Sequence, residues 1–127
     1  MEPLIVDTDI LIDYFRNHAD AVTFLEADPQ RVRLSVITVA ELYQGVFEGH
    51  ERRALETLLE KLSLLPVTPE IAEQAGLWSR DYYRSHRLAL TDCLIAATSK
   101  VHGLRLATLN RKHYPMLSEV ETPYRME

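Results

Sequence analysis

The first apolar run of the chain is short and unbroken. LIV at residues 4–6 predicts a buried strand, because a continuous run of this length has no polar face to give to solvent. The stretch TDILIDYFRN follows directly and repeats apolar side chains at helical spacing, so a helix is expected to begin at Asp7 or Thr8. A second helix is predicted over residues 21–27, and the β-branched run VRLSVIT at 32–38 predicts the next strand.

The same alternation continues to the end of the chain. Helices are predicted from Val39 through Phe47 and over the leucine-rich stretch that starts at residue 51, followed by a brief strand at 64–68. Thr68 before Pro69 is a helix-start signal, and this helix is expected to run towards His86. A last helix at 92–102 should end at Gly103, with strands at 104–108 and near Val120.

Strands that alternate with helices along a whole chain are typical of the α/β class. We therefore expect one domain over residues 1–127, built as a three-layer α/β/α sandwich with a mainly parallel central sheet. In such sheets ligands bind outside the carboxyl ends of the strands. Polar residues that directly follow a predicted strand are therefore the first candidates for a functional site.

Four candidates stand at such boundaries. Asp7 follows the strand at 4–6, Glu41 comes just after the strand at 32–38, Asp92 opens a helix, and Asn110 follows the strand at 104–108. If the three strands are neighbours, these side chains should meet in one cleft. Clustered carboxylates repel one another unless a cation neutralises them, and oxygen-only ligand sets favour Mg²⁺ or Mn²⁺ over zinc.

Each candidate also has an ordinary structural explanation. Thr38 and Glu41 match the capping-box pattern, Asp92 suits a helix N-cap or first turn, and Asn110 suits a turn. Asp7 is harder to explain in this way, because a charge beside a buried strand needs a partner.

Two further acids follow Asp7 on the same predicted helix. Asp9 is a first-turn acid that either complements the helix dipole or supports a metal site from behind its ligands. Asp13 is expected to be a solvated surface acid.

Composition narrows the function without choosing it. The 127 residues carry 14 Lys and Arg against 19 Asp and Glu, a net charge of −5, so any grip on nucleic acid must be local. Arg111 and Lys112, beside Asn110, are the candidate RNA contacts. Cys93 is the single cysteine, which excludes intramolecular disulfides and thiolate zinc sites. Because no apolar run is long enough to span a membrane, a cytoplasmic protein without membrane contact is expected.

Three segments carry a family resemblance: VDTDILID, SVITVAELYQG and LTDCLIAATSKVHGLRLATLNRKHY. In this order they resemble the PIN domain, specifically the VapC class of bacterial and archaeal toxin ribonucleases. The resemblance implies an endoribonuclease that needs Mg²⁺ or Mn²⁺, forms a homodimer and is inhibited by a small antitoxin.

The same resemblance assigns roles to individual residues. It implies that Asp7, Glu41 and Asp92 hold the metal, while Asn110 stands where many members have Asp and orients a water or a second, weaker ion. It also places Thr8 and Thr108 as hydroxyls that support the site.

Two other functions fit parts of the sequence. Asp7-Thr8-Asp9 after an apolar strand is similar to the aspartate pair of haloacid-dehalogenase-like phosphatases, although Leu11 stands where that motif wants Thr or Val. A catalytically degenerate module that only binds protein or RNA would explain Asn110 as a lost acid. Loss of cation binding in Asp92→Asn would separate the nuclease from that module.

Overall fold

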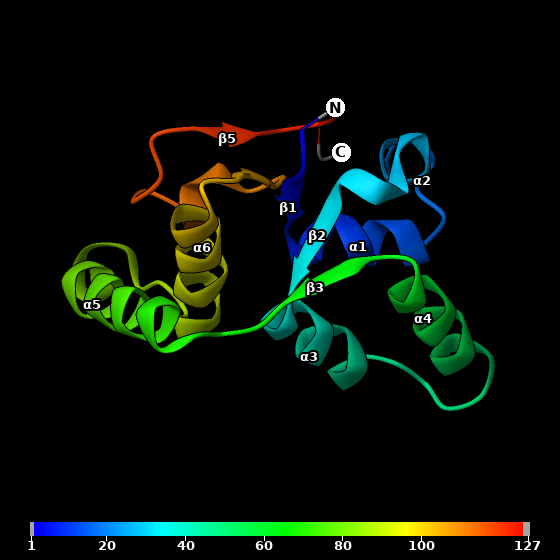
Figure 1. Ribbon diagram of the computed structural model, residues 1–127, viewed down its shortest axis with the longest axis horizontal. Coiled ribbons are helices and arrows are strands. Elements are labelled where there is room, and N and C mark those ends of the chain that lie inside the picture. The colour runs from blue at the N-terminus through cyan, green and yellow to red at the C-terminus, as the bar shows by residue number, and fades with distance from the viewer. Residues whose placement is uncertain (1, 126–127) are drawn as a thin grey trace.

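A parallel sheet forms the centre of the molecule, whose computed structural model describes residues 2–125 (Figure 1). In these residues the sheet has five strands in the order β3-β2-β1-β4-β5, and every neighbouring pair is parallel. The strands are short: β1 Leu4–Val6, β2 Val32–Ser35, β3 Ser63–Leu65, β4 Arg105–Ala107 and β5 Val120–Glu121. The predicted α/β class with a parallel sheet is confirmed.

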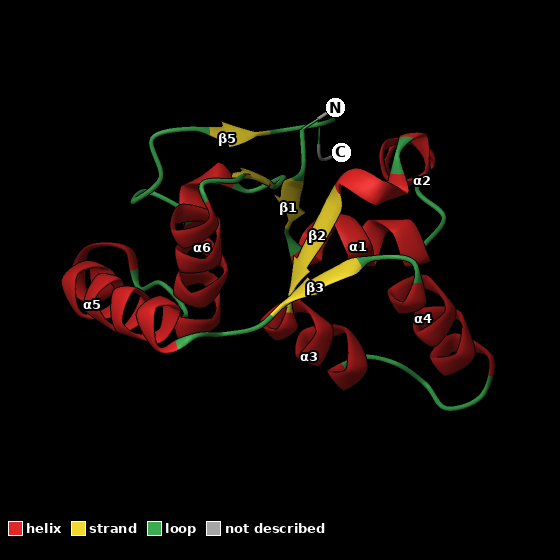
Figure 2. Cartoon of the chain, viewed as in Figure 1, coloured by secondary structure: helices red, strands yellow, loops and turns green. Residues whose placement is uncertain are grey.

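Helices cover both faces of this sheet (Figures 1 and 2). One side carries α1 Thr8–Phe15, α2 Ala19–Ala27 and α4 His50–Glu60, and the other carries α5 Pro69–His86 and α6 Leu90–His102. Helix α3 Val36–Gln44 lies at the carboxyl end of β2 and contacts α1, α4 and α6. The three-layer arrangement is the expected one. No helix in the described part of the chain is both long and apolar enough to cross a membrane.

The pleat of β1 divides the core into two halves. Leu4 and Val6 pack into a cluster with Leu11 of α1 and other apolar side chains, whereas Ile5 packs against Ile95 of α6 on the opposite face. Successive side chains of a strand point to opposite faces, so a strand covered on both sides needs apolar residues at every position. This explains why LIV has no polar residue.

The register of β1 and β4 brings two site residues together. Val6 pairs with Ala107, so the residues that follow, Asp7 and Thr108, leave the sheet side by side. The Asp7 N–H donates to the Ala107 carbonyl at 2.9 Å and extends the ladder by one bond. Because β2 is the other neighbour of β1, the expected adjacency of the three strands is confirmed.

Several predicted element boundaries are wrong. Strand β2 ends at Ser35 instead of residue 38, because the Ser35 hydroxyl accepts from the Ile37 N–H at 3.0 Å and starts α3 there. Helix α6 begins at Leu90, two residues before Asp92, and β3 ends at Leu65. The caps at Thr68 and Gly103 are confirmed: the Thr68 hydroxyl accepts from Ile71 N–H, and Gly103 adopts a left-handed φ of 64°.

Candidate active site

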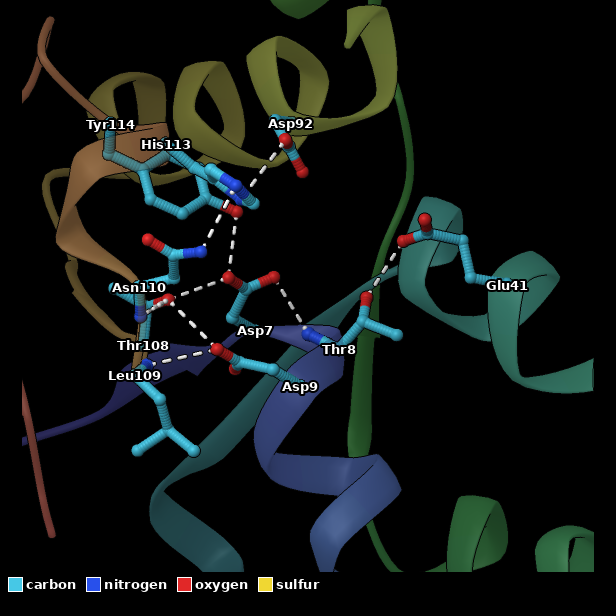
Figure 3. A network of polar contacts seen from close by, with 10 residues as sticks. All are labelled: Asp7, Thr8, Asp9, Glu41, Asp92, Thr108, Leu109, Asn110, His113 and Tyr114. Atoms are coloured by element: carbon cyan, nitrogen blue, oxygen red, sulfur yellow. Dashed lines mark hydrogen bonds and ion pairs between the residues drawn. The ribbon is translucent and has the colours of Figure 1, made fainter. Parts of the chain in front are cut away.

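Asp7 lies at the centre of a polar network at the carboxyl end of β1 (Figure 3). Its side chain is buried, and both oxygens accept hydrogen bonds. Oδ1 accepts from the Thr8 N–H at 2.8 Å, and Oδ2 accepts from the Thr108 hydroxyl at 2.7 Å and the Tyr114 hydroxyl at 2.8 Å. These donors come from α1, from the residue after β4 and from the end of the 3₁₀ turn Arg111–His113, so the carboxylate is fixed from three sides.

Asp9, one helical position beyond Thr8, faces the loop after β4. Its Oδ2 accepts from the Leu109 N–H at 3.0 Å, while its buried Oδ1 has no hydrogen-bond partner among the described residues. Burial and then the charge of Asp7 raise the Asp9 pKa to about 7. Near neutral pH the Asp9 carboxyl is therefore only partly ionised, and it contacts the loop that leads to Asn110.

Asp13 is not the solvated surface acid that the sequence predicts. It is half-buried, and its Oδ2 accepts from the Tyr124 hydroxyl at 2.9 Å. The Tyr124 ring stacks on His18 with 5.0 Å between centroids, and burial together with Asp13 raises the pKa of the tyrosine. The segment after β5 thus covers this side of α1, a contact that local sequence does not reveal.

Glu41 reaches the network through Thr8. The Thr8 hydroxyl donates to Glu41 Oε1 at 2.8 Å (Figure 3). The same hydroxyl lies 3.0 Å from the Thr38 hydroxyl. Since α3 starts at Val36 with Ser35 as its cap, Glu41 stands in the second turn and cannot be a capping-box partner. That explanation of Glu41 is wrong.

Asp92 lies in the first turn of α6, whose N-cap is Ala89. The N-cap explanation is therefore wrong, whereas a first-turn acid is what the structure has. Burial and the charges of Asp7 and Glu41 raise the Asp92 pKa to about 6, against a lowering by His113. Each of the other two acids is thus close enough to act on Asp92 electrostatically.

The 3₁₀ turn after β4 brings two residues to the acids for which the sequence predicts no role there: His113, which it offers only as a possible RNA contact, and Tyr114. His113 lies with Nε2 3.0 Å from Asn110 Nδ2 and Nδ1 3.5 Å from Asp92 Oδ2. Tyr114 is buried against Asp7. The only sequence signal for them is that they follow Asn110 by three and four residues. One tight turn over that distance brings their side chains back to the cleft. Arg111 and Lys112 in the same turn are exposed.

The electrostatics of the two raised acids give a testable pH dependence. A carboxyl whose pKa is higher in the folded protein than its ordinary 3.8 stabilises the fold below about pH 4, and this stabilisation is lost as the pH rises through 6 to 7. We expect the melting temperature of the metal-free protein to fall by about 3–6 °C between pH 5.5 and 8, roughly 1 kcal/mol or more.

Thermal unfolding in EDTA at both pH values measures this effect. Asp9→Asn should flatten the dependence, whereas Glu119→Gln, at an exposed loop position, should leave it unchanged. Two results would show that folding does not raise the Asp9 pKa. One is a wild-type melting temperature that rises with pH, and the other is an Asp9→Asn profile identical to that of the wild type.

The donor chemistry of the site suits a divalent cation. Asp7, Glu41 and Asp92 present only oxygen, which hard ions such as Mg²⁺ and Mn²⁺ prefer, and Asp9 Oδ1 is a buried oxygen without a hydrogen-bond partner among the described residues. In the described part of the chain, no three His, Cys, Asp or Glu side chains are grouped so that they could hold a metal ion as they stand.

A groove of about 890 Å³ leads away from the same site. It runs between α1, α2, α3 and α4, and we call it the α1–α4 groove. Its walls mix apolar side chains, such as Ile12 and Phe15 from α1 and Leu58 from α4, with polar and charged ones, and Glu41 is among the latter. One side chain is thus shared between the acidic site and the groove.

Comparison with known proteins gives the family. The sequence-family model for the PIN domain matches residues 4–116. The chain belongs to the PIN-domain family. Two curated relatives from Mycobacterium tuberculosis are named ribonucleases. VapC10 is 40% identical to this PIN domain over 95% of this chain and 92% of its own length, and VapC19 is 34% identical over 94% and 98%.

Solved structures agree with this assignment. A toxin–antitoxin complex from Klebsiella pneumoniae superposes on this PIN domain with a TM-score of 0.82 at 31% identity, covering 97% of this chain and 99% of that chain. FitAcB from Neisseria gonorrhoeae gives a TM-score of 0.76 at 26% identity, covering 97% and 99%. The predicted resemblance to PIN domains of the VapC class is confirmed.

Proposed function

We propose that this PIN domain is the endoribonuclease toxin of a toxin–antitoxin pair and acts in the cytoplasm. The observation that carries the proposal is the convergence of Asp7, Glu41 and Asp92, from β1, α3 and α6, into one electrostatically coupled group. The names of the curated relatives, ribonucleases VapC10 and VapC19, supply the reaction class. The names of the structural neighbours supply the biological setting.

In this proposal Asp7, Glu41 and Asp92 hold one Mg²⁺ or Mn²⁺. When bound, such an ion neutralises phosphate charge and lowers the pKa of a water that attacks the phosphodiester. Thr8 and Thr108 hold Glu41 and Asp7 in place through their hydroxyls. Asp9 fixes the loop that carries Leu109 and Asn110 beside the cleft.

RNA contacts are proposed at the rim. Arg111 and Lys112 are exposed, directly follow Asn110 and lie in the turn that brings His113 to Asp92. With a net charge of −5 the chain as a whole repels RNA, so these two cations would place a phosphate over the acids.

The chemistry of the cut ends tests the mechanism. If water is the nucleophile, cleavage of a 5′-labelled RNA in Mg²⁺ or Mn²⁺ should leave 3′-hydroxyl and 5′-phosphate ends, which ligation and phosphatase treatment identify. Ends that carry a 2′,3′-cyclic phosphate would mean attack by the RNA's own 2′-OH and would contradict this role for the acids.

An antitoxin is the proposed partner, since the neighbours from Klebsiella and Neisseria include a toxin–antitoxin complex by name. The α1–α4 groove is where it would bind, because the groove offers apolar side chains from α1 and α4 and reaches Glu41 at the site. An apolar segment lying there could place a basic side chain among the three carboxylates and so displace cation and RNA together.

A homodimer is also proposed. Val36 and Tyr43 of α3 and Leu90 at the start of α6 are exposed apolar side chains on two helices that contact each other. Such exposed side chains are candidates for the contact between two copies. Light scattering on the purified chain decides this: a monomer mass at micromolar concentration would contradict it.

Of the two other functions, the phosphatase is set aside by the family assignment and by Asp9, whose carboxyl is tied to Leu109 N–H and buried. The degenerate binding module predicts a chain that neither binds Mn²⁺ nor cuts RNA.

A further inference from the structure

The side chain of Asn110 directs its amide nitrogen, which cannot bind a cation, towards His113. Its amide nitrogen lies 3.0 Å from Nε2 of His113, and its carbonyl oxygen points to the other side (Figure 3). The His113 ring stands between Asn110 and Asp92, with Nδ1 3.5 Å from Asp92 Oδ2. The three side chains form a row at the rim of the cleft.

Hydrogen positions along this row follow from its chemistry. A neutral imidazole carries one N–H, and the nitrogen that faces a carboxylate must be the one that bears it. In the neutral ring this arrangement favours hydrogen on Nδ1, the nitrogen nearer Asp92, and leaves Nε2 as an acceptor. Only the amide NH₂ of Asn110 can donate to that acceptor, which agrees with the orientation of the side chain.

An aspartate at position 110 could not do this. An ionised carboxylate has no hydrogen to donate, so it would pair only with a ring that carries hydrogen on both nitrogens. The asparagine at the position where the resemblance leads one to expect an acid is thus matched to the histidine three residues later. Asn110 and His113 work as a pair.

We propose that His113 is a positioning residue for the metal ligand Asp92, and that Asn110 acts through His113 and does not itself bind the cation. The inference rests on the proposed metal-dependent function. The pair orients the Asp92 carboxylate and leaves Asp7, Glu41 and Asp92 as the ligand set of a single ion.

Cation affinity should report this arrangement. Partners that orient a metal ligand typically change affinity by about 10–100-fold, and His113 is half-exposed, so we expect about tenfold weaker Mn²⁺ binding in His113→Ala. Asn110→Ala should weaken binding no more than His113→Ala does. The double variant should bind like His113→Ala alone, because Asn110 has no effect once the ring is gone.

Calorimetric titration of Mn²⁺ into wild type, both single variants, the double variant and His102→Ala tests the proposal. His102, exposed at the end of α6, is the matched histidine control and should not change affinity. Losses that multiply in the double variant would mean that Asn110 binds the ion itself and would overturn the inference. So would unchanged affinity in His113→Ala.

The tautomer of His113 is a second readout that needs neither metal nor RNA. Nitrogen NMR of ¹⁵N-histidine in metal-free protein at pH 8.5 should show His113 with hydrogen on Nδ1, and Asn110→Ala should shift it towards Nε2–H. Hydrogen on Nε2 in wild type would overturn the arrangement.

The failures are distinguishable. If Asp92→Asn abolishes Mn²⁺ binding while His113→Ala does not, only the positioning role fails. If wild type binds no Mn²⁺, both the proposed function and the effect on affinity fail.

Discussion

Asp92→Asn is expected to reduce RNA cleavage by about 10²–10³-fold or more and to weaken Mn²⁺ binding, with no loss of folded structure. The change removes one of three negative ligands and alters no volume. It also removes a group whose pKa burial raises to about 6, so the metal-free protein should melt at the same or a higher temperature at pH 8. Cleavage assays, calorimetry and thermal unfolding on one preparation measure all three.

Glu70→Gln is the matched control for this substitution. Glu70 is also a first-turn acid of a helix, α5, but it is exposed and lies outside the acidic site. The Glu70→Gln variant should cleave RNA at the wild-type rate. If Asp92→Asn cut as well as Glu70→Gln, Asp92 would be no more than a favourable charge at a helix N-terminus.

Filling the α1–α4 groove is expected to abolish inhibition by antitoxin while cleavage persists. Ala54 is exposed on α4 and lines the groove, so Ala54→Arg places a long cationic side chain where the partner's apolar segment would lie. Arg is a strong helix former, and the fold should tolerate it. Loss of a hot-spot contact of this kind typically weakens binding by about 2–4 kcal/mol, or 30–1,000-fold.

The measurement is inhibition of cleavage by increasing antitoxin, with Glu60→Arg as the control. Glu60 is exposed on the same helix but does not line the groove. If the antitoxin concentration that inhibits wild type also inhibits Ala54→Arg, the antitoxin binds elsewhere. Loss of inhibition in Glu60→Arg as well would point to the charge of α4 instead of the groove.

The sequence predicted the α/β class because each element has a local signal. LIV favours a strand buried on both faces, which the structure has, and Thr68-Pro69 and Gly103 mark helix ends that the structure confirms. Boundaries failed where two signals competed. The run VRLSVIT is β-branched throughout, but the hydroxyl of Ser35 satisfies a free N–H of the next helix and ends the strand three residues early.

The candidate site was predicted as far as strand order allows. Asp7 directly follows a predicted strand, whereas Thr108 falls inside the predicted strand 104–108 and was assigned through the family resemblance. Strand β4 ends at Ala107, so the register of β1 and β4 brings the two residues together. Tyr114 could not be found in this way, because its contact with Asp7 depends on how the 3₁₀ turn folds back. The contact of Asp13 with Tyr124 could not be predicted either, because Tyr124 comes from the far end of the chain. The α1–α4 groove arises from four helices and has no local signal at all.

The central claim is that the acidic group of Asp7, Glu41 and Asp92 cuts RNA with a divalent cation. Its most direct test is incubation of antitoxin-free protein with transfer, ribosomal and messenger RNAs in Mg²⁺ or Mn²⁺, in EDTA, and with folded Asp92→Asn. We expect discrete cuts in some RNAs with metal and none in either control. Intact RNAs under every condition, together with no Mn²⁺ binding, would contradict the claim and favour a module that only binds its partners.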